Sequence, residues 1–161
     1  VLVQAITKSD RNKEMLELAV EAGVDRIIPW QSERSISKWQ SDSEQKWQVG
    51  IKQSCKQARQ VKLPQLMQVM STSEVIKSIS EGGFGIVFHE EAPTKFSDLT
   101  IPNSQPSVYL VIGPEGGISE QELLSFQNNG SNVVRLGDTV LRSAHAGFAA
   151  LSAVQTKLGR W

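Results

Sequence analysis

The stretch Gly113–Gly117 (GPEGG) offers the clearest arrangement of residues for binding a ligand. Glycines let main-chain amides approach a ligand closely, and the N-terminus of a following helix adds partial positive charge. An apolar run, Val108–Ile112, precedes the stretch, and the capping-box residues Ser119 and Glu122 follow it. The stretch has neither a Gly-Lys-Ser/Thr end nor a GxGxxG pattern, so it is not a Walker A loop or a dinucleotide fingerprint. Two interpretations stay open, a ligand-binding turn and a structural turn between a strand and a helix.

A second loop of the same type runs from Arg135 to Arg142, between an apolar run and a helix rich in small residues. Open α/β sheets bind ligands at the carboxyl ends of their strands, so we expect both loops to line one crevice. Arg142 stands at the start of the helix, where a positive charge opposes the helix dipole. An arginine placed unfavourably for its own helix indicates a role toward a ligand. Arg142 is therefore the leading candidate for a functional side chain.

The other reactive residues do not form a familiar catalytic or metal-binding set. His89 and His145 lack a nearby cysteine nucleophile and metal-type spacing, which favours packed or surface positions for both. Glu90 and Glu91 are adjacent, and adjacent residues on a strand point to opposite faces, so joint acid–base action is not expected. The single Cys55 excludes an intramolecular disulfide and a multi-cysteine zinc site. We therefore expect no metal.

These candidates need a scaffold, and the chain supplies alternating strand-like and helix-like segments. Apolar and β-branched runs predict strands at Val1–Ile6, Val24–Ile28, Phe84–Phe88, Val108–Ile112 and Val133–Leu136. Periodic patterns and caps predict helices around Met15–Ala22, over Ser43–Ala58, after Ser71, after Ser119 and over Ser143–Leu158. Pro29 has no N–H to donate and is expected to end the second strand. This alternation predicts an α/β fold with a parallel sheet covered by helices on both faces.

Composition places the chain among ordinary globular proteins. Its 161 residues include 17 basic and 17 acidic side chains, and 39% are hydrophobic. No apolar run approaches the roughly 18 residues of a membrane span, and the first residues lack the basic start of a signal peptide. We therefore expect a soluble, cytoplasmic protein that does not bind a membrane.

The neutral total conceals a basic segment. Between Arg26 and Lys62, eight basic residues face three acidic ones. Such an excess suits contact with phosphates, and it equally suits a solvated helix face. Trp30 and Trp39 flank several of these charges, a mixture that fits RNA recognition, although tryptophan more commonly fills a core or an interface.

Three blocks of the sequence together resemble the RsmE family of SPOUT-class methyltransferases. In the family's order, the blocks are GVDRIIPWQSERSISKW (Gly23–Trp39), VIGPEGGIS (Val111–Ser119) and LGDTVLRSAHAGFAALSAVQ (Leu136–Gln155). The family uses S-adenosylmethionine to methylate N3 of a uridine in small-subunit (16S) ribosomal RNA. The resemblance implies a homodimer and an α/β fold with a C-terminal trefoil knot, with residues 1–161 as the SPOUT domain. The family's N-terminal PUA-like barrel has no counterpart in the sequence, so we expect a catalytic domain alone.

The resemblance also implies where the cofactor binds, mainly on backbone groups of the two loops and at the end of a third strand. The implied cofactor-binding residues are His89, Glu90, Ile112, Gly113, Pro114, Glu115, Gly116, Gly117, Leu136, Gly137, Val140, Leu141 and Arg142. Arg142 is expected to be the catalytic residue, because its guanidinium could stabilise the uracil anion formed when N3 loses its proton. No clear general base is present; Glu115 could be a base, a cofactor ligand or a structural residue.

Basic residues outside the loops are assigned to RNA. We expect Arg34, Lys38 and Arg59 to contact phosphates of the ribosomal RNA. One departure from the family is Ser143-Ala144-His145, where members often have Thr-Glu-Thr or Thr-Ser-Thr. Two other functions stay open, a SPOUT methyltransferase acting on a ribose 2′-oxygen or a tRNA base, and a nucleotide- or RNA-binding module without catalysis.

Overall fold

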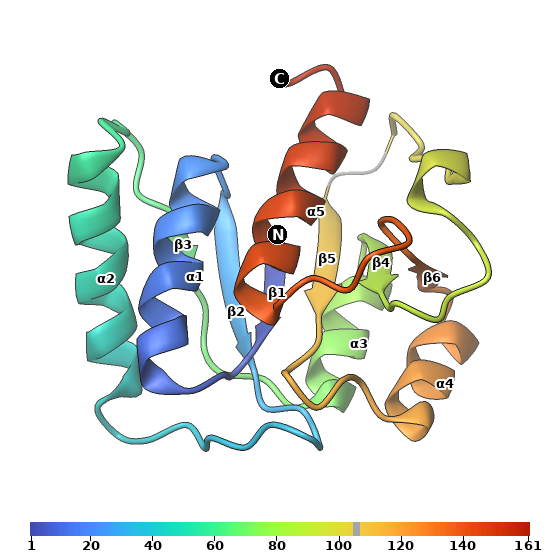
Figure 1. Cartoon of the computed structure of the whole chain (residues 1–161), viewed down its shortest axis with the longest axis horizontal. Coiled ribbons are helices and arrows are strands. Elements are labelled where there is room, and N and C mark those ends of the chain that lie inside the picture. The colour runs from blue at the N-terminus through green and yellow to red at the C-terminus, as the bar shows by residue number, and fades with distance from the viewer. Residues whose placement is uncertain (105–106) are drawn as a thin grey trace.

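A parallel β-sheet of six strands forms the centre of the computed structural model, which describes residues 1–104 and 107–161 (Figure 1). In chain order the strands are β1 (Leu2–Ala5), β2 (Arg26–Trp30), β3 (Gln65–Leu66), β4 (Phe84–Phe88), β5 (Val108–Ile112) and β6 (Asn132–Val134). Across the sheet the order is β3-β2-β1-β5-β4-β6, and each paired neighbour runs parallel. The sheet explains the apolar character of these runs, because both of its faces are covered.

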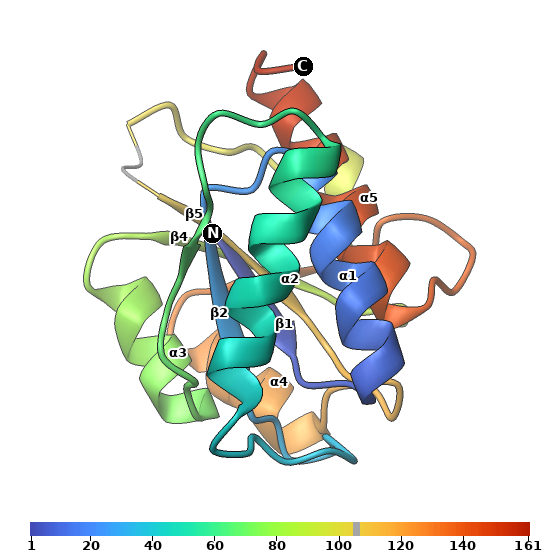
Figure 2. The ribbon, with the colours of Figure 1, turned by 90° about the vertical axis from the view of Figure 1, so that its left-hand side faces the viewer.

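Helices cover the two faces unequally. The helices are α1 (Ser9–Glu21), α2 (Ser43–Gln57), α3 (Thr72–Ser80), α4 (Glu120–Asn128) and α5 (Ser143–Lys157), with a short 3-10 helix, η1, at Phe96–Asp98. Apolar residues of α1, α2 and α5 share one buried cluster with Leu2 and Leu110, whereas those of α3 and α4 share another with Val3 and Val111. Neighbouring residues on a strand point to opposite faces, so strands such as β1 and β5 contribute residues to both clusters. Figure 2 shows the resulting three layers.

The predicted fold class is confirmed, and several element boundaries agree with the sequence. β4 and β5 have the predicted bounds, and α3 and α4 begin at the predicted capping boxes. The prediction that Pro29 ends its strand was wrong, because Pro29 lies inside β2. Its carbonyl accepts a hydrogen bond from the Met70 N–H, on the side of β2 where β3 has already ended. A proline nitrogen without a hydrogen is tolerated at such a poorly paired edge. The trefoil knot stays a prediction.

The strand order places a crevice at one edge of the sheet. From β1 the chain continues to β2 and β3 on one side, while β5, β4 and β6 lie on the other side of β1. Ligands of open α/β sheets bind outside the carboxyl ends of the strands at such a reversal. Here that position lies between the ends of β1 and β5, and the predicted loop Gly113–Gly117 follows β5 directly.

Both ends of the chain lie at the opposite edge of the sheet, near the first residues of the strands (Figure 1). The Val1 amino group donates a hydrogen bond of 2.7 Å to the Val108 carbonyl, and Arg160 lies 3.3 Å from the Asp25 carboxylate. Burial raises the pKa of Asp25, but the hydrogen bond and charge of Arg160 and the charge of Lys62 outweigh it and lower the pKa overall. Within the described ranges, no helix has the length and apolar character that a membrane span requires.

Candidate functional site

A cavity of about 300 Å³ opens at the carboxyl ends of β4 and β5. Its walls include the loop after β5, the end of β4 at His89 and Glu90, and the segment Val140–Ser143 that leads into α5. A smaller hollow of about 70 Å³ adjoins it and contains Leu136 and Gly137. The two share His89, Glu90 and other wall residues, so the loops after β5 and β6 do surround one crevice, as the sequence predicts.

Twelve of the thirteen residues predicted to bind a cofactor line one or both of these hollows. They are His89, Glu90, Ile112, Gly113, Pro114, Glu115, Gly117, Leu136, Gly137, Val140, Leu141 and Arg142. Gly116 is the exception, because it faces the neighbouring segment instead: its carbonyl lies 3.3 Å from the Arg34 guanidinium. The structure therefore brings the predicted set together and turns one glycine toward a predicted RNA-contacting residue.

Glycines in both loops leave room for a bound molecule. Gly117 has a positive φ of 73°, which L side chains rarely adopt. A Cβ built on Gly117 or on Gly137 would meet no heavy atom within 4 Å, so each loop borders open space at these positions. Together with the apolar side chains of Ile112, Val140 and Leu141, this open backbone suits a flat heterocycle with polar edges.

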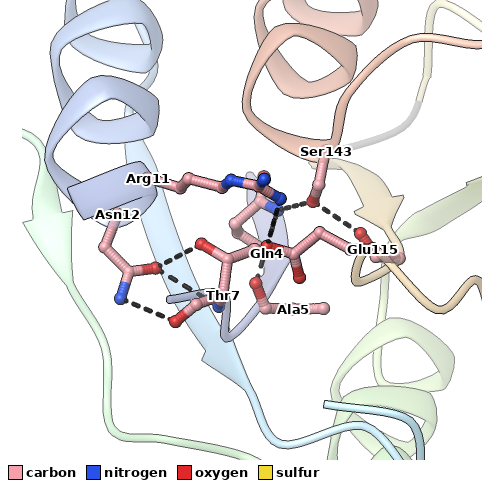
Figure 3. A network of polar contacts seen from close by, with 8 residues as sticks. Gln4, Ala5, Thr7, Arg11, Asn12, Glu115 and Ser143 are labelled. Atoms are coloured by element: carbon pink, nitrogen blue, oxygen red, sulfur yellow. Dashed lines mark hydrogen bonds and ion pairs between the residues drawn. The ribbon is translucent and has the colours of Figure 1, made fainter. Parts of the chain in front are cut away.

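Two linked hydrogen bonds, one buried and one partly buried, join β1, α5 and the loop after β5 (Figure 3). The Gln4 side-chain amide donates to Ser143 Oγ at 2.8 Å, and the Ser143 hydroxyl donates to the Gly113 carbonyl at 2.6 Å. Gln4 is fully buried, and its Oε1 has no hydrogen-bond partner among the described residues. That oxygen packs against α5, because a Cβ added at Gly147 would lie 3.0 Å from it. Gln4 thereby fixes the start of α5 relative to the loop after β5.

An ion pair ties α1 to the same loop. Arg11 Nη1 lies 2.9 Å from Glu115 Oε1, and both side chains are labelled in Figure 3. The turn in front of α1 is held by Asn12, whose Oδ1 accepts from the Thr7 hydroxyl at 2.8 Å and whose Nδ2 donates to the Thr7 carbonyl at 3.1 Å. Glu115 is therefore engaged by a guanidinium at the mouth of the cavity.

Arg142 occupies the N-cap position of α5, and its side chain lines the cavity. It is exposed, and within residues 1–104 and 107–161 its guanidinium forms no hydrogen bond or ion pair with a described side chain. A cation at this helix end receives no favourable dipole interaction. The guanidinium is thus available to a ligand in the cavity.

The three residues predicted to contact RNA lie in different places. Arg34 lies against the loop after β5, and Lys38 lines a separate groove beside α1 and α2. Arg59 follows the far end of α2, which at 1.5 Å per residue is roughly 20 Å from its start. Trp30 is fully buried and cannot stack on a base, whereas Trp39 is half-buried beside Lys38.

Glu122 has a role that its capping box did not reveal. Its Oε1 accepts hydrogen bonds from the Glu33 backbone N–H at 2.9 Å and the Thr72 hydroxyl at 2.7 Å. The Ser119 hydroxyl donates to Glu33 Oε2 at 2.5 Å. These contacts fix the segment that carries Arg34 against the base of α4. Gln4 could have been noticed from the sequence, because it is the one polar residue inside the apolar run Val1–Ile6.

No cluster of three or more His, Cys, Asp or Glu side chains able to hold a metal ion occurs in the described part of the chain.

Comparison with known proteins agrees with the family resemblance of the sequence and with the observed fold. A family model described as an RNA methyltransferase domain matches residues 1–155. A curated relative from Mycobacterium bovis, named ribosomal RNA small subunit methyltransferase E, is 36% identical over 168 residues. The alignment covers 99% of this chain and 64% of the relative, so the chain spans less than two thirds of that protein's length.

Two similar solved structures contain a bound cofactor. One is ribosomal RNA small subunit methyltransferase E from Neisseria gonorrhoeae bound to S-adenosylmethionine, with a TM-score of 0.87 and 29% sequence identity. The other is a methyltransferase from Legionella pneumophila in complex with the same cofactor, also with a TM-score of 0.87 and 29% identity. Each alignment covers 96% of this chain and 64% of the other.

Proposed function

The chain belongs to the family of RNA methyltransferase domains, and from that premise we propose that it methylates N3 of a uridine in small-subunit ribosomal RNA, using S-adenosylmethionine. The observation that carries this proposal is the meeting of the loops after β5 and β6 around one cavity, with Arg142 at its wall. The cofactor-bound relatives, with the same fold and 29% identity, support the choice of cofactor.

The cavity residues fit this cofactor. The open space beside Gly117 and Gly137 leaves room for adenine and ribose to approach the main chain, while Ile112, Val140 and Leu141 offer apolar contacts to the rings. His89 and Glu90 close the same space from the end of β4. When bound, S-adenosylmethionine supplies a methyl group already activated by its sulfonium. The protein's main task is then to align that methyl group with the acceptor and to exclude water.

Arg142 would act on the acceptor. N3 of uridine carries an imide proton that must leave before or during attack, and this places negative charge on the uracil oxygens. A guanidinium near those oxygens stabilises the charge, an effect worth several kcal/mol where water is excluded. Arg142 is exposed beside the cavity and forms no ion pair with the described side chains, so no such pair has to break before it contacts the acceptor.

We also propose that the chain forms a homodimer around this site. Val140 and Leu141 are 76% and 40% exposed, although both are large apolar residues beside the cavity. A second copy that covers them would shield the cofactor from water. Light scattering after size-exclusion chromatography should give a mass near twice 17.7 kDa, and Val140→Asp should shift it toward the monomer.

The test of the function combines a binding and a product measurement. Calorimetry with S-adenosylhomocysteine should show one site per chain. Mass spectrometry of nucleosides from treated small-subunit RNA should show 3-methyluridine. A 2′-O-methylated nucleoside or a methylated tRNA base would replace the proposed target with another. Absence of both cofactor binding and product would leave a binding module without catalysis.

A further inference from the structure

A groove with a volume of about 920 Å³ lies between α1 and α2, apart from the proposed cofactor cavity. Its floor includes Ile6 and Thr7 at the end of β1, and its rim includes the segment Ser37–Gln40. The N-termini of α1 and α2 both border it, and helix N-termini carry partial positive charge. It therefore lies on the same edge of the sheet as the cofactor cavity.

Lysines dominate the charged residues along this α1–α2 groove. Lys8, Lys13, Lys38 and Lys46 line it, against the single acid Asp42. Asp42 is engaged by Lys46 at 2.7 Å, whereas Lys8 and Lys38 form no ion pair with the described side chains. Lysine is depleted in protein–protein interfaces but is typical of surfaces that bind nucleic-acid phosphates. The charge therefore favours a polyanion over a protein partner.

An aromatic ring stands in the same groove and is held in place from two sides. Trp39 packs edge-to-face on the buried Trp47 with ring centroids 5.3 Å apart. The Trp39 backbone N–H donates to Gln31 Oε1 at 3.0 Å, and Gln31 Nε2 donates to the Ser37 carbonyl at 3.2 Å. Trp39 is half-buried, so part of its ring faces the groove. A fixed, partly exposed tryptophan among lysines is the arrangement used to stack single-stranded bases.

The first turn of α1 separates the groove from the cofactor cavity. Lys8 and Asn12 line the groove, whereas Arg11, one residue before Asn12, lines the cofactor cavity. The turn is braced by the Thr7–Asn12 hydrogen bonds and by the Arg11–Glu115 ion pair. A single strand of RNA lying in the groove would thus pass directly beside the site where we propose that a base is methylated.

We propose that the α1–α2 groove binds the single-stranded RNA that flanks the target nucleotide, with a base stacked on Trp39 and phosphates held by Lys8 and Lys38. This inference rests on the proposed function for the identity of the substrate. It adds a second site on the same chain, distinct from the cofactor cavity, that would set the affinity for RNA rather than the affinity for the cofactor.

The experiment uses the 161-residue chain and a fluorescein-labelled 12-nucleotide oligouridine, with binding followed by anisotropy at several salt concentrations. Lys8→Gln/Lys38→Gln should weaken binding at least fivefold at 50 mM salt. It should also make the slope of log K against log salt shallower by about 1.4, because each phosphate contact on a single strand contributes about 0.7. The matched control is Lys52→Gln/Lys56→Gln, which removes two exposed lysines of α2 outside the groove and should weaken binding less than twofold.

Crosslinking gives an independent reading of the same site. An oligonucleotide containing 4-thiouridine should crosslink on irradiation to the peptide that contains Trp39. Equal weakening by the two lysine pairs, crosslinks confined to other segments, or no binding by the unmodified chain would each overturn the proposal. So would a change of oligomeric mass in Lys8→Gln/Lys38→Gln, which would show that a second copy of the chain occupies the groove.

Failure of this inference can be told apart from failure of the proposed function. S-adenosylhomocysteine binding, measured by calorimetry, should be the same in both lysine pairs and in the unmodified chain. Loss of RNA affinity with normal cofactor binding supports the groove. Normal RNA binding by the groove without cofactor binding or product would retain the groove and reject methyl transfer.

Discussion

The Gln4 side-chain amide, buried in the middle of the sheet, donates a hydrogen bond of 2.8 Å to the hydroxyl of Ser143 at the first turn of α5. The two residues are 139 positions apart in the sequence. Because Ser143 in turn donates to the Gly113 carbonyl, this contact couples the two loops that form the proposed cofactor cavity. The relative position of the two loops thus depends on one polar side chain in an otherwise apolar strand.

Ser143→Ala should lower the free energy of unfolding by about 1–3 kcal/mol, because it leaves the buried Gln4 amide with only a 3.4 Å contact to the Ala5 carbonyl. Adding Gln4→Met removes that unpaired amide together with its partnerless oxygen. The double variant should therefore lose less stability than the two single variants together, by about 0.5–3 kcal/mol. Urea unfolding of all four proteins measures this coupling, and strictly additive losses would contradict it.

Arg142→Ala should lower the rate of methyl transfer at least tenfold, since it removes the charge that we propose stabilises the uracil anion. The fold should not suffer, because the side chain is exposed and its charge opposes the dipole of α5. The expected control is a melting temperature equal to or slightly above that of the unmodified chain. S-adenosylhomocysteine affinity should stay largely intact, because the cofactor is expected to bind mainly to backbone groups of the two loops. Full turnover by Arg142→Ala would remove the role given to this residue.

Glu122→Gln should destabilise the protein by about 1–3 kcal/mol, because an amide cannot accept from all the donors that now surround the carboxylate. The loss should be accompanied by faster amide hydrogen exchange at Glu33, whose N–H bonds to Glu122 Oε1. Glu120→Gln is the matched control, because Glu120 lies exposed in the same helical turn and should change stability by less than about 0.5 kcal/mol. Equal effects of both substitutions would contradict this, because they would show that Glu122 stabilises the protein only through its negative charge in the first turn of α4.

Cys55 should be unreactive in the folded protein. Its side chain is buried on α2, and burial raises the pKa of the thiol, so little thiolate forms even at pH 8. Iodoacetamide should label it at least a hundredfold more slowly than in 6 M guanidinium chloride. Cys55→Ser/Lys52→Cys, which moves the thiol to an exposed position on the same helix, should be labelled rapidly. Fast labelling of native Cys55 would mean that α2 opens frequently.

Local patterns were sufficient for much of the scaffold. The continuous apolar runs Phe84–Phe88 and Val108–Ile112 are flanked by glycine or turn residues, which fixes both ends of each strand. The two-residue strand β3 was missed because Gln65–Leu66 is too short to show a period. The prediction for Pro29 was wrong because a proline is tolerated inside β2 only where the neighbouring strand β3 has already ended. The sequence around Pro29 gives no information about that neighbouring strand.

Some features of the candidate site could likewise be predicted from the sequence, and others could not. The glycine-rich loops and Arg142 could be found because each follows a strand and precedes a helix in the sequence itself. Arg11 could not be linked to Glu115, because the pair is 104 residues apart and is made only when α1 and the loop after β5 meet. The α1–α2 groove was missed for the same reason: its lysines come from α1, from the segment before α2 and from α2 itself.

The position of the chain ends has a practical consequence for engineering. Val1 and Arg160 are both fastened at the edge of the sheet where the strands begin, through Val108 and Asp25. A fluorophore, an affinity tag or an additional domain fused at either terminus would emerge away from the cavity at the ends of β4 and β5 and away from the α1–α2 groove. Both would stay open to solvent. For single-molecule or surface assays, the protein can therefore be immobilised through either end without covering the edge where we propose that RNA binds.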